Sequence, residues 1–223
     1  MDFWKVRRTI ILNTLNEKMI SIGHSYELPT FEADDEDLRD MNLQQQNELY
    51  FQCIKNFILG EYTQRFYPYL NERKGNRIIF KITKGSHPEV KANMKNLFPL
   101  LRDTVQCRIF VCELLKKTDL GLVVRSVAEV LQNFLHSEFP SIVHKLFDEA
   151  RELENLDTAT TFLAADLKVL SNALSRMVKV GMIGGQLISY LNHPETLHLS
   201  KSIVPSLFAK CIKTGMQYYN GFL

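Results

Sequence analysis

The sequence predicts an all-α protein, an antiparallel bundle of about seven helices with one short β-hairpin or extended arm near residues 74–84. Three observations support this fold class. Apolar residues recur at three- and four-residue steps through most of the chain, which places them along one face of successive helices. The links between these stretches are short after residue 95, as expected for antiparallel neighbours. The 45% hydrophobic and 23% charged residues are ordinary for a globular protein with a substantial core.

The helical pattern divides the chain into successive segments with recognisable ends. Gly60 is expected to weaken the helix that precedes it, and Pro99 and Pro140 are expected in the first turns of later helices. Asp157 is expected to cap the start of another helix. In chain order, the sequence predicts helices at residues 2–22, 38–59, a short one from 88, 98–117, 120–139, 140–153, 157–180 with a kinked continuation to 191, and 202–219.

Residues 120–139 are expected to form the central helix of the bundle. Apolar residues cover so much of its circumference that neighbouring elements should pack on several sides. A narrow polar strip is expected to face water, formed by Arg125, Ser126, Glu129, Gln132 and Asn133. In the helix at 157–180, Phe162 is expected to face inward together with the leucines that surround it.

One stretch, residues 71–88, lacks the helical pattern. It contains the run RIIFKIT at residues 77–83, in which basic and apolar residues alternate as they do in a half-buried strand. Gly75 and Asn76 precede this run and suit a tight turn. Because a strand pair is only marginally stable alone, this element is expected to pack against the helices.

The chain divides into two parts by composition. Residues 96–223 are expected to form the compact helical bundle, whereas residues 1–95 hold the N-terminal helices, an acidic linker and a basic arm. The pattern leaves open whether both parts belong to one continuous domain. No internal repeat of fixed period is present, which argues against a regular solenoid.

Composition and motifs argue against several functional classes. The formal net charge of +2 is too small to predict a nucleic-acid-binding field over the whole protein. The four cysteines form no CxxC pair, which predicts reduced thiols and no metal site. No phosphate-loop, hydrolase, metalloprotease or kinase motif is present, so the sequence predicts no cofactor and no catalytic residue. The absence of a signal-peptide pattern and of ~18 consecutive apolar residues predicts a soluble intracellular protein, cytoplasmic or nuclear.

The candidate contact site is a cluster of basic residues between positions 73 and 95. It consists of Arg73, Lys74, Arg77, Lys81, Lys84, Lys91 and Lys95. Within this window only Glu89 opposes these charges, whereas residues 32–40 carry an acidic run. Charge segregation of this kind steers a protein toward a partner of complementary charge. The same lysines have a second interpretation, because lysines on a solvated strand edge also prevent edge-to-edge pairing.

These observations favour a non-enzymatic helical protein–protein interaction module, an adaptor or scaffold subunit of a larger intracellular complex, with the basic arm as its contact surface. One alternative is a phosphate-directed binder of nucleic acid or anionic membrane through residues 73–95. A second alternative is an apolar-ligand carrier or enzyme with a pocket inside the bundle, near Tyr62 to Tyr69 or near the glycines at 181–185. The apolar C-terminal residues Phe222 and Leu223 leave homo-oligomerisation open.

Overall fold

The computed structural model of the chain describes residues 37–71, 77–117, 120–193 and 203–220. These ranges include both strands of the hairpin and the helices of the bundle. Several sequence-based expectations fall outside the described residues. They are the helix at 2–22, most of the acidic linker, the turn at Gly75 and Asn76, and the C-terminal Phe222 and Leu223.

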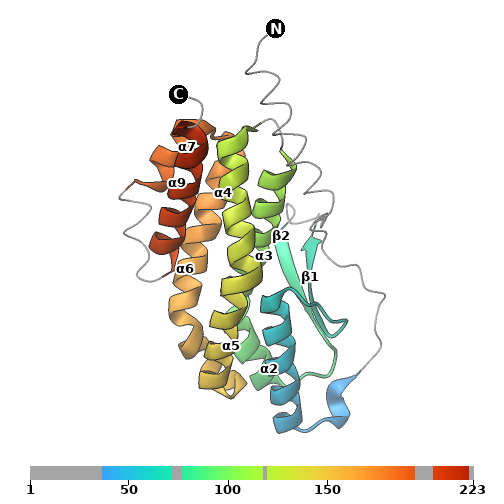
Figure 1. Cartoon of the computed structure of the whole chain (residues 1–223). Coiled ribbons are helices and arrows are strands. Elements are labelled where there is room, and N and C mark those ends of the chain that lie inside the picture. The colour runs from blue at the N-terminus through green and yellow to red at the C-terminus, as the bar shows by residue number, and fades with distance from the viewer. Residues whose placement is uncertain (1–36, 72–76, 118–119, 194–202, 221–223) are drawn as a thin grey trace.

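The described residues form an all-α bundle with a two-stranded antiparallel hairpin at its side, which confirms the predicted fold class (Figure 1). The elements in chain order are η1 (Leu38–Asp40), α2 (Leu43–Leu59), β1 (Phe66–Asn71), β2 (Arg77–Ile82), α3 (Pro88–Lys116), α4 (Leu122–Asn133), the π-helical turn η4 (Phe134–Glu138), α5 (Phe139–Ala150), α6 (Leu153–Val180), α7 (Gly184–Leu191) and α9 (Val204–Asn220). In the view of Figure 1 the chain rises through α3, descends through α4, η4 and α5, and rises again through α6. Consecutive long helices are therefore antiparallel, whereas α3 and α6 pack side by side in parallel.

Helix α2 has clear local signals at both ends. At its start, Asn42 Oδ1 accepts a hydrogen bond from Gln45 N at 2.9 Å, and Gln45 Oε1 accepts one from Asn42 N at 3.1 Å. This reciprocal capping box sets the first turn of the helix. At its end, Gly60 adopts the left-handed conformation with φ 99° and ends the helix, a stronger effect than the expected weakening. The predicted start at Leu38 was too early, because the cap at Asn42 separates η1 from α2.

The hairpin pairs β1 with β2 in a register that places Pro68 opposite Phe80. The sequence indicated β2 but not β1, because the aromatic residues 62–69 were expected to lead from the preceding helix to a break at Pro68. Proline is tolerated here because each strand of a two-stranded sheet has a free edge. The rings of Phe66 and Phe80 lie 5.1 and 5.6 Å from the ring of Phe57 in α2. The hairpin therefore packs against the helices, as predicted.

Helix α3 is a single helix of 29 residues, which corrects the prediction of two helices divided at Pro99. Pro99 lies inside the helix at an exposed position. Proline removes the backbone hydrogen bond to the carbonyl of Lys95, and at an exposed position water can satisfy that carbonyl. The buried residues Leu97 and Leu101 continue one apolar face past the proline. Packing of this face keeps the helix intact across Pro99.

Helix α4 continues through η4 into α5 without an intervening loop (Figure 1). It is buried on nearly every side, which agrees with its prediction as a central helix. The expected polar strip was wrong in part, because Arg125 and Ser126 are each only 3% exposed. Ser126 Oγ donates to Val123 O at 2.9 Å, and Arg125 Nε lies 3.7 Å from Glu129 Oε1. Both polar side chains are thus accommodated within the bundle.

The connection between α5 and α6 is shorter than predicted. Helix α5 ends at Ala150 and α6 begins at Leu153, so the predictions of a helix through 153 and of a cap at Asp157 were both wrong. Arg151 adopts a left-handed φ of 60° and its N–H bonds to Phe147 O at 3.0 Å. A left-handed residue at this position ends the helix and turns the chain. Sequence analysis missed this turn because glycine usually occupies such a position.

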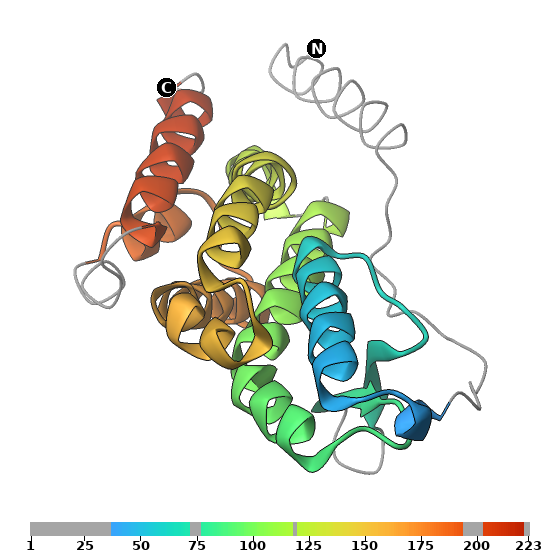
Figure 2. The same ribbon diagram turned by 90° about the horizontal axis from the view of Figure 1, so that it is seen from below.

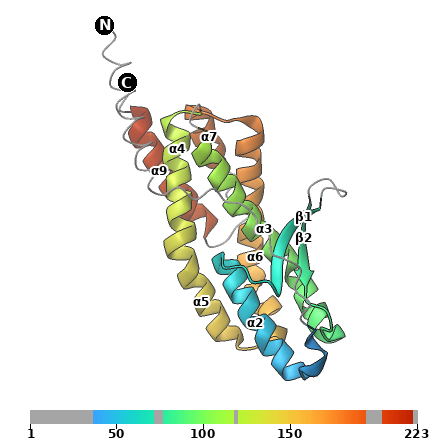
Figure 3. The same cartoon turned by 90° about the vertical axis from the view of Figure 1, so that its right-hand side faces the viewer.

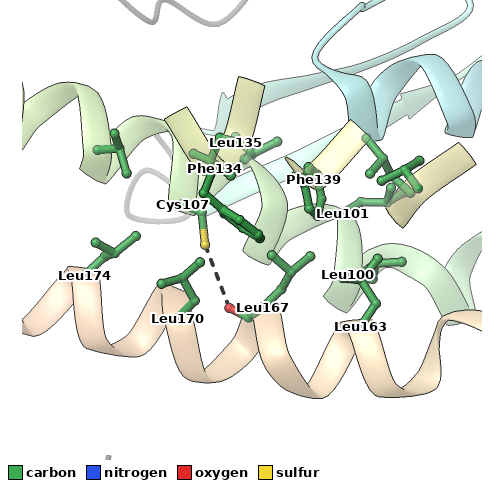
Figure 4. Packing of buried hydrophobic residues seen from close by; sticks show 14 of the residues in the cluster. Leu100, Leu101, Cys107, Phe134, Leu135, Phe139, Leu163, Leu167, Leu170 and Leu174 are labelled. Atoms are coloured by element: carbon green, nitrogen blue, oxygen red, sulfur yellow. Dashed lines mark hydrogen bonds between the residues drawn. The ribbon is translucent and has the colours of Figure 1, made fainter. Parts of the chain in front are cut away.

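The core between α3 and α6 is rich in leucine (Figure 4). The row contributed by α6 consists of Leu163, Leu167, Leu170 and Leu174. Cys107 of α3 lies in this interface, with its Sγ 3.8 Å from the carbonyl oxygen of Leu167. Phe162 was expected to face inward, but it is 75% exposed. It lies about 100° around the helix from Leu163 and so outside the arc that α3 covers.

Helix α2 lies at the lower end of the bundle, between the hairpin and the connection from α5 to α6 (Figures 2 and 3). It contacts α3 and α6 as well as these two elements. The two sides of α2 therefore face different surroundings, one formed by the hairpin and one formed by the turn at Arg151.

Candidate interaction surface

The structure describes the side chains of four of the seven predicted contact residues. These four are Lys81 in β2, Lys84 between β2 and α3, and Lys91 and Lys95 in α3. Arg77 is the first residue of β2, and Arg73 and Lys74 lie outside the described residues. The predicted cluster thus extends over three different elements, and its geometry depends on how the β2–α3 connection is held.

A buried glutamine fastens the β2–α3 connection to the rest of the molecule. Gln46 of α2 is 3% exposed, and its Oε1 accepts a hydrogen bond from His87 N at 2.7 Å. Its Nε2 donates to Leu38 O at 2.8 Å. Leu38 N in turn donates to Lys84 O at 3.0 Å, which attaches η1 to the backbone that carries the lysine. One side chain therefore ties η1, α2 and the start of α3 together.

Further hydrogen bonds hold the same connection from inside. Tyr50 Oη and Ser86 Oγ lie 2.7 Å apart, and Ser86 Oγ also lies 2.8 Å from Thr83 O. Tyr50 is fully buried and Ser86 is 5% exposed. Gly85 has a φ of 78°, and a side chain at this position would collide with Asp37. The backbone around Lys84 is therefore fixed by buried polar groups and by close approach, as a preformed contact surface requires.

Lys81 is the most constrained of the four lysines. The register places Lys81 opposite Tyr67, and its Nζ lies 5.4 Å from the centroid of the Tyr67 ring. A cation over an aromatic face is attracted to the ring. Ile78 and Phe80 point to the opposite, inner face of the strand, where they are each 7% exposed. The alternation of faces predicted for β2 is confirmed, but the half-buried Lys81 already has an intramolecular contact.

The other three described lysines of the cluster differ from Lys81 in what surrounds their amino groups; they are Lys84, Lys91 and Lys95. Lys84 and Lys95 are exposed and Lys91 is half-buried. Lys91 and Lys95 are one helical turn apart and so project from one side of α3. Among the described residues, no carboxylate forms an ion pair with any of these three amino groups. Within the described part of the chain, these three positive charges are therefore not neutralised by an ion pair.

Arg102 extends this set and was missed by sequence analysis. It is exposed on α3, seven residues after Lys95, a spacing that returns to nearly the same side of a helix. The 4- and 7-residue spacing of positions 91, 95 and 102 was visible in the sequence. Arg102 was not included because the basic window defined from the sequence ends at Lys95. We call Lys84, Lys91, Lys95 and Arg102 the basic surface.

The aromatic residues at 62–69 that the structure places in the interior pack against α2 and the hairpin. The ring of Tyr62 lies 4.9 Å from that of Phe57, and burial raises the pKa of Tyr62 to about 12. Phe66 is fully buried between α2 and the hairpin. Of the glycines at 181–185, Gly181 caps the end of α6 with a φ of 66°, and Gly184 begins α7. Tyr62 and Phe66 thus fill space beside α2, and Gly181 turns the backbone at the end of α6.

The cysteines are free and mostly enclosed. Cys53, Cys107 and Cys211 are buried and Cys112 is half-buried. Burial raises the pKa of each of these thiols, for Cys211 to about 12. Because the thiolate is the reactive form, all of them are held in the unreactive thiol form at neutral pH. In the part of the chain that the structure describes, no three His, Cys, Asp or Glu side chains come together as a metal site.

None of the helices built from described residues combines the length and apolar character needed to cross a membrane.

Comparisons with other proteins add no functional information. The chain matches no known protein family, and comparison with curated proteins found no similar sequence.

Proposed function

We propose that the chain is a non-enzymatic helical interaction module, an adaptor or scaffold subunit that binds an acidic surface of a partner protein through the basic surface. One observation carries this proposal. The three lysines of the basic surface lack carboxylate partners among the described residues, while buried hydrogen bonds hold the backbone beside them. Charges that are already positioned and not internally neutralised favour association with a complementary partner.

The surroundings of the basic surface support a protein partner. Pro99 is exposed on α3 between Lys95 and Arg102, so an apolar ring lies among the charges of the basic surface. Protein interfaces combine such apolar contacts with a charged rim. The near-neutral chain, at +2, also lacks the broad positive field typical of proteins that bind nucleic acid along its phosphates. A phosphate-directed function remains the alternative proposal for the same lysines.

The test is charge reversal of the basic surface. A variant carrying Lys84→Glu, Lys91→Glu and Lys95→Glu is compared with the native chain in affinity purification from the native source. The matched control reverses three exposed lysines elsewhere, Lys116→Glu, Lys179→Glu and Lys213→Glu. Only the first variant is expected to lose its co-purifying proteins, while circular dichroism shows the same thermal unfolding for all three chains. Equal retention of partners by both variants would refute the proposal.

The alternative is separated by its salt dependence. The native chain is titrated with labelled single-stranded and double-stranded DNA, and with vesicles of anionic lipid, at increasing salt. Phosphate-directed binding weakens steeply as salt rises, because counterions are released from the phosphates on binding. Tight binding with this slope, abolished by the triple lysine variant, would replace the protein-partner proposal with the phosphate-directed one. Absence of binding at low salt would remove the alternative.

A further inference from the structure

A groove opens beside α2, between this helix and the turn from α5 into α6. It has a volume of about 570 Å³, which lies within the range of ligand-binding pockets. One wall is the first half of α2 and the other is the turn from α5 into α6. The two walls are about a hundred positions apart in the chain, so only the fold brings them together. This groove is separate from the basic surface, which lies beyond α2.

The floor of the groove is apolar and rigid. Phe51 and Leu153 line it and are 9% and 2% exposed. The ring of Phe51 lies 4.9 Å from that of Phe147, so it is held by the core of the bundle. Apolar surface at the bottom of a groove offers a place for an apolar side chain of a ligand, which would be removed from water there.

The rim of the groove is acidic. Glu48 from α2 and Glu152 and Glu154 from the opposite wall line it, together with Arg151 as the single basic residue. Three glutamates and one arginine give a formal charge of −2. All four are exposed, and none forms an ion pair with a described residue. An anionic ligand would be repelled by this rim, and a cationic ligand would be attracted to it.

One polar atom in the groove lacks a partner. Asn47 lines the groove from the α2 wall, and its Oδ1 is buried without a hydrogen-bond donor among the described residues. A buried acceptor without a donor is costly and gains free energy when a donor is supplied. Lysine and arginine side chains carry donors only, so they suit both this acceptor and the carboxylates of the rim.

We propose that the groove binds a basic peptide segment of a partner protein, with an apolar residue on the Phe51–Leu153 floor and an adjacent Lys or Arg side chain against the glutamates and Asn47. The charge of the groove determines this choice of occupant. The site is independent of the proposed function, because it has the opposite charge and lies on the other side of α2. A chain with both surfaces joins an acidic partner to a basic one.

The probe is a fluorescein-labelled peptide of alternating leucine and arginine, titrated with the full chain in fluorescence anisotropy. A peptide of alternating leucine and glutamate is the matched control for charge. The test variant carries Glu48→Gln and Glu154→Gln, which remove two charges from the rim. The control variant, Glu61→Gln and Glu89→Gln, removes two exposed charges outside the groove and so changes the net charge equally.

We expect the arginine peptide to bind, the glutamate peptide not to bind, and the rim variant to bind about tenfold more weakly, as two exposed charge pairs predict. The control variant should bind like the native chain. A variant with Lys84, Lys91 and Lys95 reversed should retain peptide binding even if it loses the acidic partner. Equal weakening by both glutamate variants, binding of the acidic peptide, or no binding of the basic peptide at low salt would each overturn the proposal.

Discussion

Replacing Gln46 by leucine is expected to lower the free energy of unfolding substantially. The buried amide of Gln46 makes three hydrogen bonds, to Leu38 O at 2.8 Å, to Met41 O at 3.0 Å and from His87 N at 2.7 Å. Each such bond contributes about 1 kcal/mol net, and a buried group left unpaired costs about 1–3 kcal/mol. Met41 and His87 are partly accessible to water, which limits this penalty. The expected loss is therefore about 3–4 kcal/mol.

The assay is urea unfolding followed by circular dichroism, with hydrogen exchange as a local readout. Gln46→Leu should lower the unfolding midpoint and speed exchange of the Leu38 and His87 amides. The control is Gln52→Leu on the same helix, where the side chain is exposed and a change within about 0.5 kcal/mol is expected. If Gln46→Leu unfolds within that margin of the native chain, the buried network does not hold the β2–α3 connection and the reasoning is refuted.

Two further predictions follow from burial. Leu163 lies in the α3–α6 core and is 4% exposed, so Leu163→Ala should lower the free energy of unfolding by about 2–5 kcal/mol in urea. Phe162 is 75% exposed, so Phe162→Ala should change the free energy of unfolding by less than about 0.5 kcal/mol. A large effect of Phe162→Ala would show that this ring is covered. Burial raises the pKa of Asp103 in the folded state, so Asp103 holds its proton more tightly in the folded chain than in the unfolded chain. The contribution of Asp103 to stability therefore declines as the pH rises through its unfolded-state and folded-state pKa values. Asp103→Asn, which retains an acceptor for Ser171 Oγ, should therefore gain stability relative to the native chain as pH rises from acidic to neutral, and a difference independent of pH would contradict this.

The fold class was predictable because the apolar period reports directly which residues are buried. Gly60 and Pro88 act through their own backbone constraints, so their effects on helix ends are visible locally. Pro99 shows the limit of this reasoning, because the packing on either side of it decides whether the helix continues. Arg151 shows another limit, since a left-handed arginine has no compositional signal.

The candidate sites differ in how much of them the sequence contained. The basic surface is nearly contiguous in the chain, so Lys84, Lys91 and Lys95 could be named before the structure was known. That no described carboxylate pairs with these lysines could not be predicted, because it depends on how other elements pack. The groove could not be predicted at all. Its walls meet only because α2 packs on α5 and α6, and the pairing of residues so distant in sequence is a tertiary event.

The π-helical turn η4 has a consequence for how the chain tolerates insertions and deletions. A π turn holds one residue more than the equivalent α-helical turn, and each residue of a helix corresponds to a rotation of about 100°. Deleting one residue between Phe134 and Glu138 would convert the π turn into a regular α-helical turn and leave α5 facing nearly the same way relative to α4, because the wider turn already accommodates the extra residue. Deleting one residue within α5 itself would instead rotate the rest of that helix by about 100°, so α5 would present a different side to α2 and α6 while α4 stayed packed on α9. A one-residue deletion in α5 would thus alter the far wall of the groove, although no residue lining it had changed.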